Sequence, residues 1–187
     1  MSSRFHFKST PLSGVWVAER KMFEDNRGVF GRLFCSKEFR EVGLDKPIVQ
    51  INHSITRIKG SVRGLHFQCP PHAETKIISC LKGEIFDVAV DLRHGSKTFL
   101  AWHGEILSAE NQRSMFIPEG FAHGFQALTD NCEMVYLHSE FYVQESESGI
   151  SVEDKRIAIK WPLPVSGLSE RDRKYVGVTA DFKGIAL

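Results

Sequence analysis

The sequence lacks most of the features that mark membrane, secreted and nucleic-acid-binding proteins. Its apolar runs are far too short to cross a membrane, and the start MSSRFHFKST has no apolar signal core. The four cysteines stand singly, without a CxxC pair, which is typical of a reduced chain. A formal net charge of +1 gives no general attraction to nucleic acid or to a membrane surface. We therefore expect a cytoplasmic protein that has neither nucleic acid nor a membrane as its partner.

Motifs of the common nucleotide-binding and hydrolase folds are missing as well. The chain contains no GxGxxG, no GxxxxGK[ST] and no GxSxG. A phosphate-bearing ligand would therefore have to be held by side chains and not by a glycine-rich loop.

What the chain does have is a long succession of short strand-like segments. Its 187 residues, 42% of them hydrophobic, suit a single domain over 1–187 with a real core. Apolar and polar residues alternate with a period of two, and Gly, Pro, Asn and Asp separate the runs. The predicted strands are 14–20, 29–34, 49–56, 61–68, 74–80, 84–91, 99–107, 113–117, 124–128 and 133–139. This spacing indicates an all-β sandwich or barrel.

Helical signals are confined to short peripheral segments. Ser36 has the side chain of an N-cap and Gly43 that of a C-terminal stop, so we expect a short helix over 37–42. Ser169 begins a second capped helical turn, 169–172. Residues 1–13 are polar, and we expect them to be loose or to form an arm that docks elsewhere.

One stretch, residues 50–91, places polar side chains on predicted strands. Gln50, Asn52 and Ser54 alternate and so share one face of a strand. An interior face should be apolar, so a polar one indicates a ligand pocket inside the sandwich or barrel. The same stretch carries three residues suited to acid–base or anion chemistry: Arg63, His66 and Lys76.

Each of these residues alone has a simpler explanation. A single Arg or Lys is more often a solvated charge than a ligand-binding group. His66 alternates with Leu65 and Phe67, so it could equally be a satisfied interior histidine. Tyr136 and Tyr142 could be packed aromatics. It is their occurrence together that needs an explanation.

Taken together, the motifs resemble those of the dTDP-4-dehydrorhamnose 3,5-epimerase family. They are DNRGVF, QINHS, RGLHFQ, KIISCLKGEIFDVAVDLR, IPEGFAHGF, VYLHSEFY, IAIKWP and LSERD, in the family's order and spacing. The resemblance implies a cupin-type antiparallel jelly roll with short peripheral helices, and a homodimer that works without a metal or other cofactor. It also implies action on a nucleotide-linked 4-keto-6-deoxyhexose. The first expectation is conversion of dTDP-4-dehydro-6-deoxy-D-glucose to dTDP-4-dehydro-L-rhamnose, with inversion at C3 and C5.

The chemistry of that reaction explains which groups the resemblance assigns to catalysis. The hydrogens at C3 and C5 are alpha to the C4 carbonyl, so their removal gives an enolate and needs a base near neutral pKa. By resemblance, His66 is this base. An imidazole base works best with a carboxylate that fixes its tautomer, and Asp172 in LSERD is the candidate for that partner. Lys76 stabilises the enolate oxygen, and Tyr136 returns a proton from the opposite face.

The resemblance also assigns residues to substrate binding. Charged side chains suited to a diphosphate are Arg27, Arg63 and His123. The binding strand contributes Gln50, Ile51 and Asn52. Tyr142 corresponds to the aromatic that stacks on the nucleobase, and Glu147 and Arg171 to further nucleotide contacts. Arg32 is also expected at the substrate, but it stands where the family pattern DxRGxFxE has an acid that meets thymine, so the nucleobase stays open.

Three alternatives remain. Related enzymes on this scaffold epimerise only C3 or only C5, or move the ketone between C3 and C4, with the same catalytic groups. A metal-dependent cupin could use His66, His72 and His123 as ligands, but the expected His-x-His pair is absent because Phe67 and Gln68 follow His66. A non-enzymatic binding module would keep the anion-binding and stacking residues but has no use for a base, a cation and an acid together.

Overall fold

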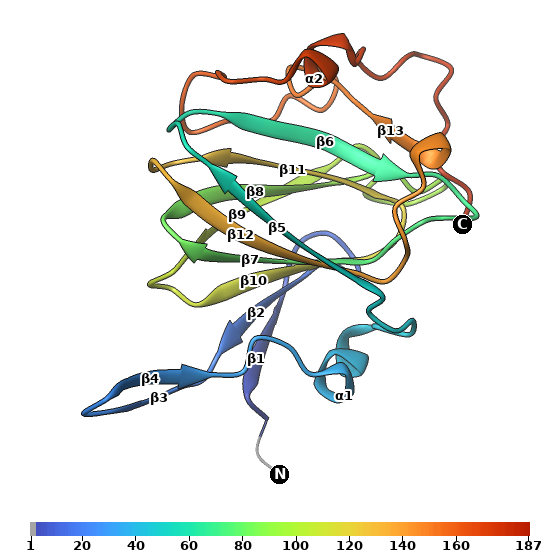
Figure 1. Cartoon of the computed structure of the whole chain (residues 1–187). Helices are drawn as coiled ribbons and strands as arrows, with labels where there is room; N and C mark the ends of the chain where they lie inside the picture. The colour runs from blue at the N-terminus through green and yellow to red at the C-terminus, as the bar shows by residue number, and fades with distance from the viewer. Residues whose placement is uncertain (1–2) are drawn as a thin grey trace.

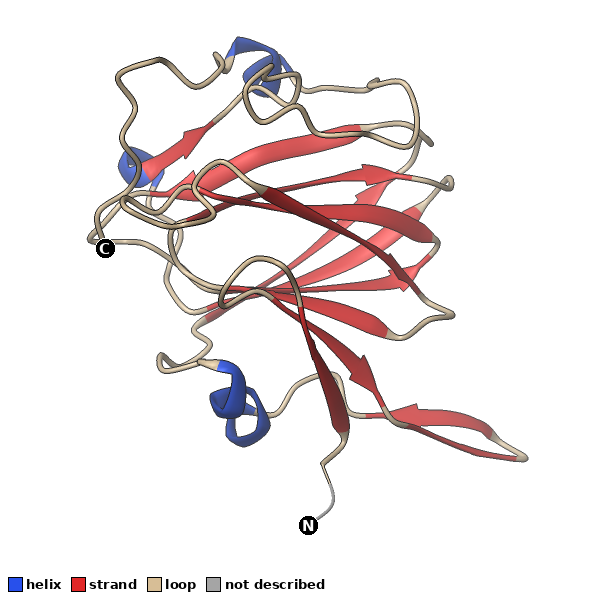
Figure 2. Ribbon diagram, turned by 180° about the vertical axis from the view of Figure 1, so that it is seen from behind, coloured by secondary structure: helices blue, strands red, loops and turns tan. Residues whose placement is uncertain are grey.

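Two antiparallel sheets face each other in the computed structural model, which describes residues 3–187 (Figures 1 and 2). The strands of the six-stranded sheet are, in spatial order, β1 (Phe5–Ser9), β2 (Trp16–Arg20), β10 (Arg113–Ile117), β7 (Lys76–Lys82), β12 (Cys132–His138) and β5 (Gln50–Thr56). Those of the five-stranded sheet are β13 (Glu147–Gly149), β6 (Val62–Gln68), β11 (Phe121–Ala127), β8 (Glu84–Asp91) and β9 (Trp102–Ser108). The prediction of an all-β, antiparallel jelly roll is confirmed.

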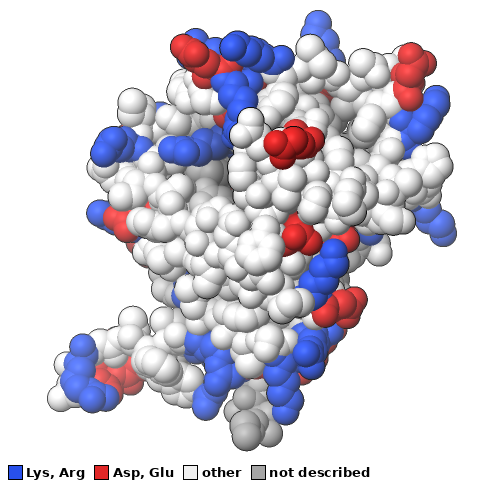
Figure 3. Space-filling model, turned by 45° about the vertical axis from the view of Figure 1, so that its right-hand side comes forward, with Lys and Arg blue, Asp and Glu red and all other residues white. Residues whose placement is uncertain are grey.

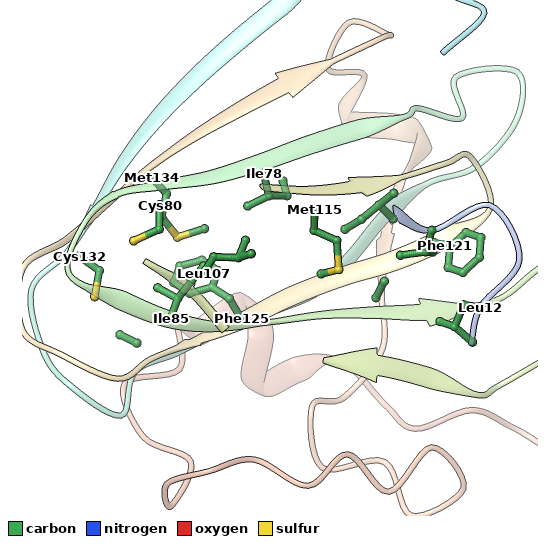
Figure 4. Close-up of a cluster of buried hydrophobic side chains, with 14 residues drawn as sticks. Leu12, Ile78, Cys80, Ile85, Leu107, Met115, Phe121, Phe125, Cys132 and Met134 are labelled. Carbon is green, nitrogen blue, oxygen red and sulfur yellow. The ribbon is translucent and has the colours of Figure 1, made fainter. Parts of the chain in front are cut away.

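The space between the sheets is divided into an apolar part and a polar part. The apolar cluster, drawn in Figure 4, contains Ile78, Met115, Phe125 and Met134, all nearly inaccessible to solvent. Tyr136 packs against this cluster and also lines the polar part. Two further clusters cover the outer faces of the sheets, so burial of apolar surface stabilises both sheets from both sides over much of their area.

The two predicted helical segments are present. Helix α1 (Ser36–Phe39) continues as the 3-10 turn η1 (Arg40–Val42), and it ends at Gly43, whose φ of 102° is left-handed. The N-cap is Cys35 and not Ser36. Phe39 is fully buried on the outer face of the six-stranded sheet, where its ring lies 6.2 Å from that of Phe116. None of the helices in residues 3–187 is long and apolar enough to cross a membrane.

Helix α2 (Glu170–Lys174) lies in the C-terminal segment above β6 (Figure 1). The Ser169 hydroxyl accepts a hydrogen bond from the Asp172 backbone N–H at 3.0 Å, which confirms the predicted cap. The short strand β13 and the 3-10 turn η2 (Gln144–Ser146) in the preceding segment were not predicted.

The N-terminal region differs from the prediction. Residues 5–9 are not loose but form β1, which pairs with β2 and buries Phe5. Residues 1 and 2 lie outside the described part, and an arm that docks on another molecule stays a prediction. The strand predicted over 29–34 is instead part of a hairpin of β3 (Met22–Asp25) and β4 (Gly28–Gly31) that projects from the sandwich (Figure 1). The Asp25 carboxylate closes its turn by accepting from the Arg27 backbone N–H at 2.9 Å.

Strands β6 and β11 approach each other unusually closely at two glycines. A Cβ added to Gly64 would lie 2.6 Å from the Cα of Gly124, and Gly64 has a φ of 133°. The register between the strands shifts at this place, between His123 and Phe125. Because His66 and His123 are register partners one step along, the close approach sets the separation of these two histidines.

Candidate active site

A cavity of about 360 Å³ opens between the two sheets. Strands β5, β7 and β12 form one wall, and β6 and β11 form the other. Ten of the residues predicted from the sequence line it: Gln50, Asn52, Arg63, His66, Lys76, His123, Tyr136, Tyr142, Glu147 and Arg171. The polar face predicted for the strand of Gln50, Asn52 and Ser54 is therefore explained by this pocket.

His66 on β6 is held by a buried carboxylate from α2. Its Nε2 donates to the Asp172 Oδ1 at 2.7 Å, and the Asp172 side chain is only 3% exposed. Burial alone would raise the pKa of Asp172, but the His66 ring and the Ser169 hydroxyl outweigh it and lower this pKa. An ionised carboxylate on Nε2 fixes the tautomer that leaves the lone pair on Nδ1. His66 is thus arranged as an imidazole base with an orienting carboxylate.

Lys76 at the start of β7 reaches toward the opposite sheet. Its Nζ lies 2.9 Å from the Glu74 Oε1 and donates to the His66 carbonyl oxygen at 3.3 Å. Burial would raise the pKa of Glu74, but the charge of Lys76 and the hydrogen bond from His138 lower it to about 2. An ammonium has three N–H donors, and these contacts within residues 3–187 use two of them. The third can be donated to an oxygen in the pocket.

Tyr136 on β12 faces the second histidine of the pocket, His123 on β11. The two ring centroids are 6.3 Å apart. Burial, with a smaller contribution from the charge of Asp87, raises the pKa of Tyr136 to about 12, although a 2.9 Å hydrogen bond to Ser54 acts in the other direction. His123 Nε2 in turn donates to the fully buried Asp87 Oδ1 at 2.7 Å. The phenol is therefore kept protonated at neutral pH.

The mouth of the pocket is formed by an exposed aromatic and an ion pair. Tyr142 is 52% exposed, and its hydroxyl donates to the Glu147 Oε2 at 2.9 Å. The same oxygen accepts from Arg171 at 2.7 Å. The hydrogen bond to Glu147 raises the pKa of Tyr142. An uncovered ring beside charged groups is suited to stacking on a flat, polar ligand.

The chain matches known proteins along most of its length. A family model described as dTDP-4-dehydrorhamnose 3,5-epimerase matches residues 9–179. The protein of that name from Shigella flexneri is 48% identical over 164 residues, which cover 87% of this chain and 90% of the relative. The one from Methanothermobacter thermautotrophicus is 44% identical over 176 residues, or 92% of this chain and 94% of the relative. This chain belongs to that epimerase family.

Solved structures of epimerases share the fold. The dTDP-6-deoxy-D-glucose-3,5-epimerase of Legionella pneumophila, in complex with dTDP-4-keto-L-rhamnose, has a TM-score of 0.90 at 38% identity, over 97% of this chain and 98% of that one. A 3'-monoepimerase from Streptomyces bikiniensis, in complex with dTDP-quinovose, has a TM-score of 0.83 at 32% identity, over 90% and 87% of the two chains. The cupin-like architecture is thereby confirmed, and the chain is an isomerase of the epimerase type.

Three of the binding residues expected from the epimerase family lie outside this pocket. Arg27 is at the tip of the β3–β4 hairpin, where its 85% exposed side chain pairs with Asp25 at 2.6 Å. The hairpin stands away from the body and carries charges of both signs (Figure 3). Arg32 pairs with Glu38 of α1 at 2.6 Å. Ile51 is 66% exposed on the outer face of β5, because it alternates with the two pocket residues beside it.

Sequence reasoning missed several groups that hold the epimerase site together. These are Glu74, Asp87, His138 and Tyr175, whose ring lies 5.9 Å from that of His66. A signal existed for His138, since it alternates with Tyr136 on one strand and so shares its face. Glu74 and Asp87 look like surface charges in the sequence, and only the packed structure shows their partners.

No group of three or more His, Cys, Asp or Glu side chains within residues 3–187 is arranged to hold a metal ion. Of the three histidines weighed as metal ligands, His66 and His123 each bind a carboxylate, and His72 does not line the pocket.

Proposed function

We propose that this epimerase converts dTDP-4-dehydro-6-deoxy-D-glucose into dTDP-4-dehydro-L-rhamnose by inverting C3 and C5. One observation carries the proposal: His66 and Tyr136 enter one pocket from opposite sheets, and Lys76 lines the same pocket with its ammonium hydrogen-bonded to the His66 carbonyl oxygen. A sugar ring between the two sheets would present one face to the base and the other to the acid. Inversion of a carbon needs this opposition, whereas binding does not.

Each inversion proceeds by the same two steps. His66 takes the proton from C3 or C5, and the electron pair of the C–H bond moves into the enolate, whose oxygen accepts a hydrogen bond from Lys76. The cation meets a charge that exists only after proton removal, so it lowers the barrier. Tyr136 then gives its proton to the other face of the same carbon, with Asp172 holding the imidazolium meanwhile. Exchange with water restores both groups.

Binding of the nucleotide is proposed for the residues around this centre. Arg63 and His123 hold the diphosphate through charge-assisted hydrogen bonds. Gln50 and Asn52 contact the ligand from β5, with Ile51 between them contributing only its backbone. Tyr142 stacks on thymine. Glu147 and Arg171 make the remaining contacts to the nucleotide. Arg32 stands where the family has an acid, and it pairs with Glu38 of the same chain, so thymine recognition here does without that acid.

We further propose that the enzyme is a homodimer in which the N-terminal region of one copy completes the site of the other. Apolar side chains exposed on the outer face of β5 and on the hairpin support this: Ile51, Ile55, Phe23, Val29 and Phe30. Such exposure favours burial against a second copy. In the dimer, Arg27 and Arg32 belong to the neighbour's binding site. All four cysteines are free thiols, which supports a cytoplasmic location for this single 187-residue domain.

The deciding experiment incubates the full-length protein with dTDP-4-dehydro-6-deoxy-D-glucose in deuterated water. We expect deuterium at both C3 and C5 by mass spectrometry and NMR, with both centres inverted. Exchange at neither carbon would overturn the proposal, and exchange at one alone would make the protein a monoepimerase. A product with its ketone at C3 would indicate a ketoisomerase. Rates before and after chelator treatment test the metal-dependent alternative, and competition by dTDP against dGDP tests the nucleobase.

A further inference from the structure

A continuous chain of hydrogen bonds joins the mouth of the pocket to Lys76 and uses His138 as its junction. The Tyr142 backbone N–H donates to Gln50 Oε1 at 3.1 Å, and Gln50 Nε2 donates to Asn52 Oδ1 at 3.2 Å. Asn52 Nδ2 lies 3.3 Å from His138 Nε2. His138 Nδ1 lies 2.7 Å from Glu74 Oε2, and the other oxygen of Glu74 holds Lys76 at 2.9 Å.

The two ends of this relay fix the direction of every bond in it. At the mouth, a backbone N–H can only donate, so Gln50 must present its oxygen there and its NH₂ to Asn52. Asn52 must then accept from Gln50 and donate to His138. At the deep end, Glu74 can only accept, because its pKa of about 2 keeps it ionised. His138 therefore carries one proton, on Nδ1, and accepts through Nε2.

We propose that His138, acting with Glu74, is a positioning residue that holds Lys76 at the sugar and Gln50 and Asn52 at the nucleotide in one mutually consistent orientation. This rests on the proposed function, in which Lys76 meets the enolate and β5 meets the nucleotide. By occupying one oxygen of Glu74, His138 sets the rotation of the carboxylate and so the direction of the other oxygen toward Lys76. The His138 side chain is 11% exposed, so water cannot easily replace it.

The relay works only with a neutral His138. A second ring proton would face the Asn52 amide nitrogen, so Asn52 would have to turn, and Gln50 after it. Gln50 would then present NH₂ to the Tyr142 N–H, where two donors cannot bond. Four groups face the His138 ring. Glu74, just before β7, and Asn52, on β5, contact its two nitrogens. Lys76 on β7 is its register partner, and the ring of Tyr136 on β12 stacks on it.

Two substitutions separate the two halves of the relay. An asparagine amide overlaps with the Nδ1 side of an imidazole ring, so His138→Asn keeps a donor for Glu74 and loses the acceptor for Asn52. A glutamine amide reaches the Nε2 side, so His138→Gln keeps the acceptor and loses the donor. We expect His138→Asn to raise KM about fivefold with little change in kcat, and His138→Gln to lower kcat about tenfold with little change in KM.

The matched control is His94→Asn, since His94 is exposed on the β8–β9 connection and its Nδ1 contacts the Lys183 carbonyl oxygen, away from the pocket. Thermal unfolding and dTDP affinity are measured for every variant. If both His138 variants change kcat and KM alike, or neither differs from His94→Asn, the relay has no positioning role. A wild type without exchange activity would instead refute the proposed function.

Discussion

The basic side chains at the deep end of the pocket are each held by a carboxylate of the same chain, whereas those at its mouth and beyond are mostly open to solvent. His66, Lys76 and His123 have partners within 2.9 Å, and their partners are almost completely buried. Arg63, by contrast, is exposed and contacts the Ile55 carbonyl oxygen at 3.3 Å. Arg27 extends from a projecting hairpin. One chain thus preorganises the basic groups at the deep end of the pocket, whereas Arg63 and Arg27 stay open to solvent.

Removal of the base should cause the largest loss of rate, because it removes the group that takes the proton and leaves the nucleotide-binding residues at the mouth of the pocket intact. His66→Asn should lower exchange at both C3 and C5 by roughly 10²–10⁴. Affinity for dTDP, measured by calorimetry, should stay near that of the wild type. Asp172→Asn should show a smaller loss of the same kind, since it removes the orienting group and not the base. Normal exchange in His66→Asn would contradict the assignment of the base.

Loss of Glu74 should affect the free energy of unfolding as well as the chemistry. The shift of its pKa from 4.5 to about 2 corresponds to about 3 kcal/mol, so Glu74→Gln should destabilise the fold by about that much at pH 7. A carboxyl group with a depressed folded-state pKa stabilises above its unfolded pKa, and this stability is lost as pH falls through the folded pKa. The difference between variant and wild type should therefore shrink between about pH 4.5 and pH 2 in urea titrations.

Deletion of one hydroxyl tests whether the acid and the stacking ring lie in different regions. Tyr136→Phe should slow the formation of inverted product roughly 10²-fold, while deuterium still enters the substrate through His66. Tyr142→Phe, its counterpart at the mouth, should leave the chemistry largely intact. If Tyr142→Phe blocks inversion and Tyr136→Phe does not, the two tyrosines have been assigned the wrong way round.

Substitution of the hairpin arginine should have the smallest effect on catalysis. Arg27→Ala should weaken dTDP binding about tenfold and leave the kcat of saturated enzyme close to normal. Mixing Arg27→Ala with His66→Asn protein should restore turnover at low substrate concentration at some sites of mixed dimers, because one copy lends the arginine and the other the base. No restoration, together with sedimentation as a monomer at micromolar concentration, would contradict the shared site.

The sequence predicted the strands of the pocket well, because alternation of polar and apolar residues survives wherever one face is buried. Strand β8 was predicted with its observed bounds, 84–91, and so was β10, 113–117. Strand β1 was missed although Phe5 and Phe7 alternate with polar residues, because this alternation is short and lies in an otherwise polar segment. Its order depends on pairing with β2 and on the contact of Phe5 with Phe39. That contact joins residues far apart in the chain, and no local pattern encodes it.

The pocket residues that contact one another were harder to predict than the residues that face the pocket. Alternation and the family motifs indicated His66, Lys76 and Tyr136. They could not indicate that Glu74 would bridge two of the pocket's basic groups or that Asp87 would lie under His123. The pairings of Glu74 with His138 and of Asp87 with His123 depend on which strands become neighbours, and a single sequence gives strands without their order.

The close approach of Gly64 and Gly124 has a consequence for how the sequence of this enzyme can change. Neither glycine offers a side chain to a ligand, yet any side chain added at either position would meet backbone atoms of the other strand at less than 3 Å. Neither glycine can therefore be replaced by a larger residue without moving the two strands apart. An alanine at Gly64 would force β6 away from β11 and separate His66 from His123, so the spacing of these two histidines is inherited through two positions that have no chemistry of their own.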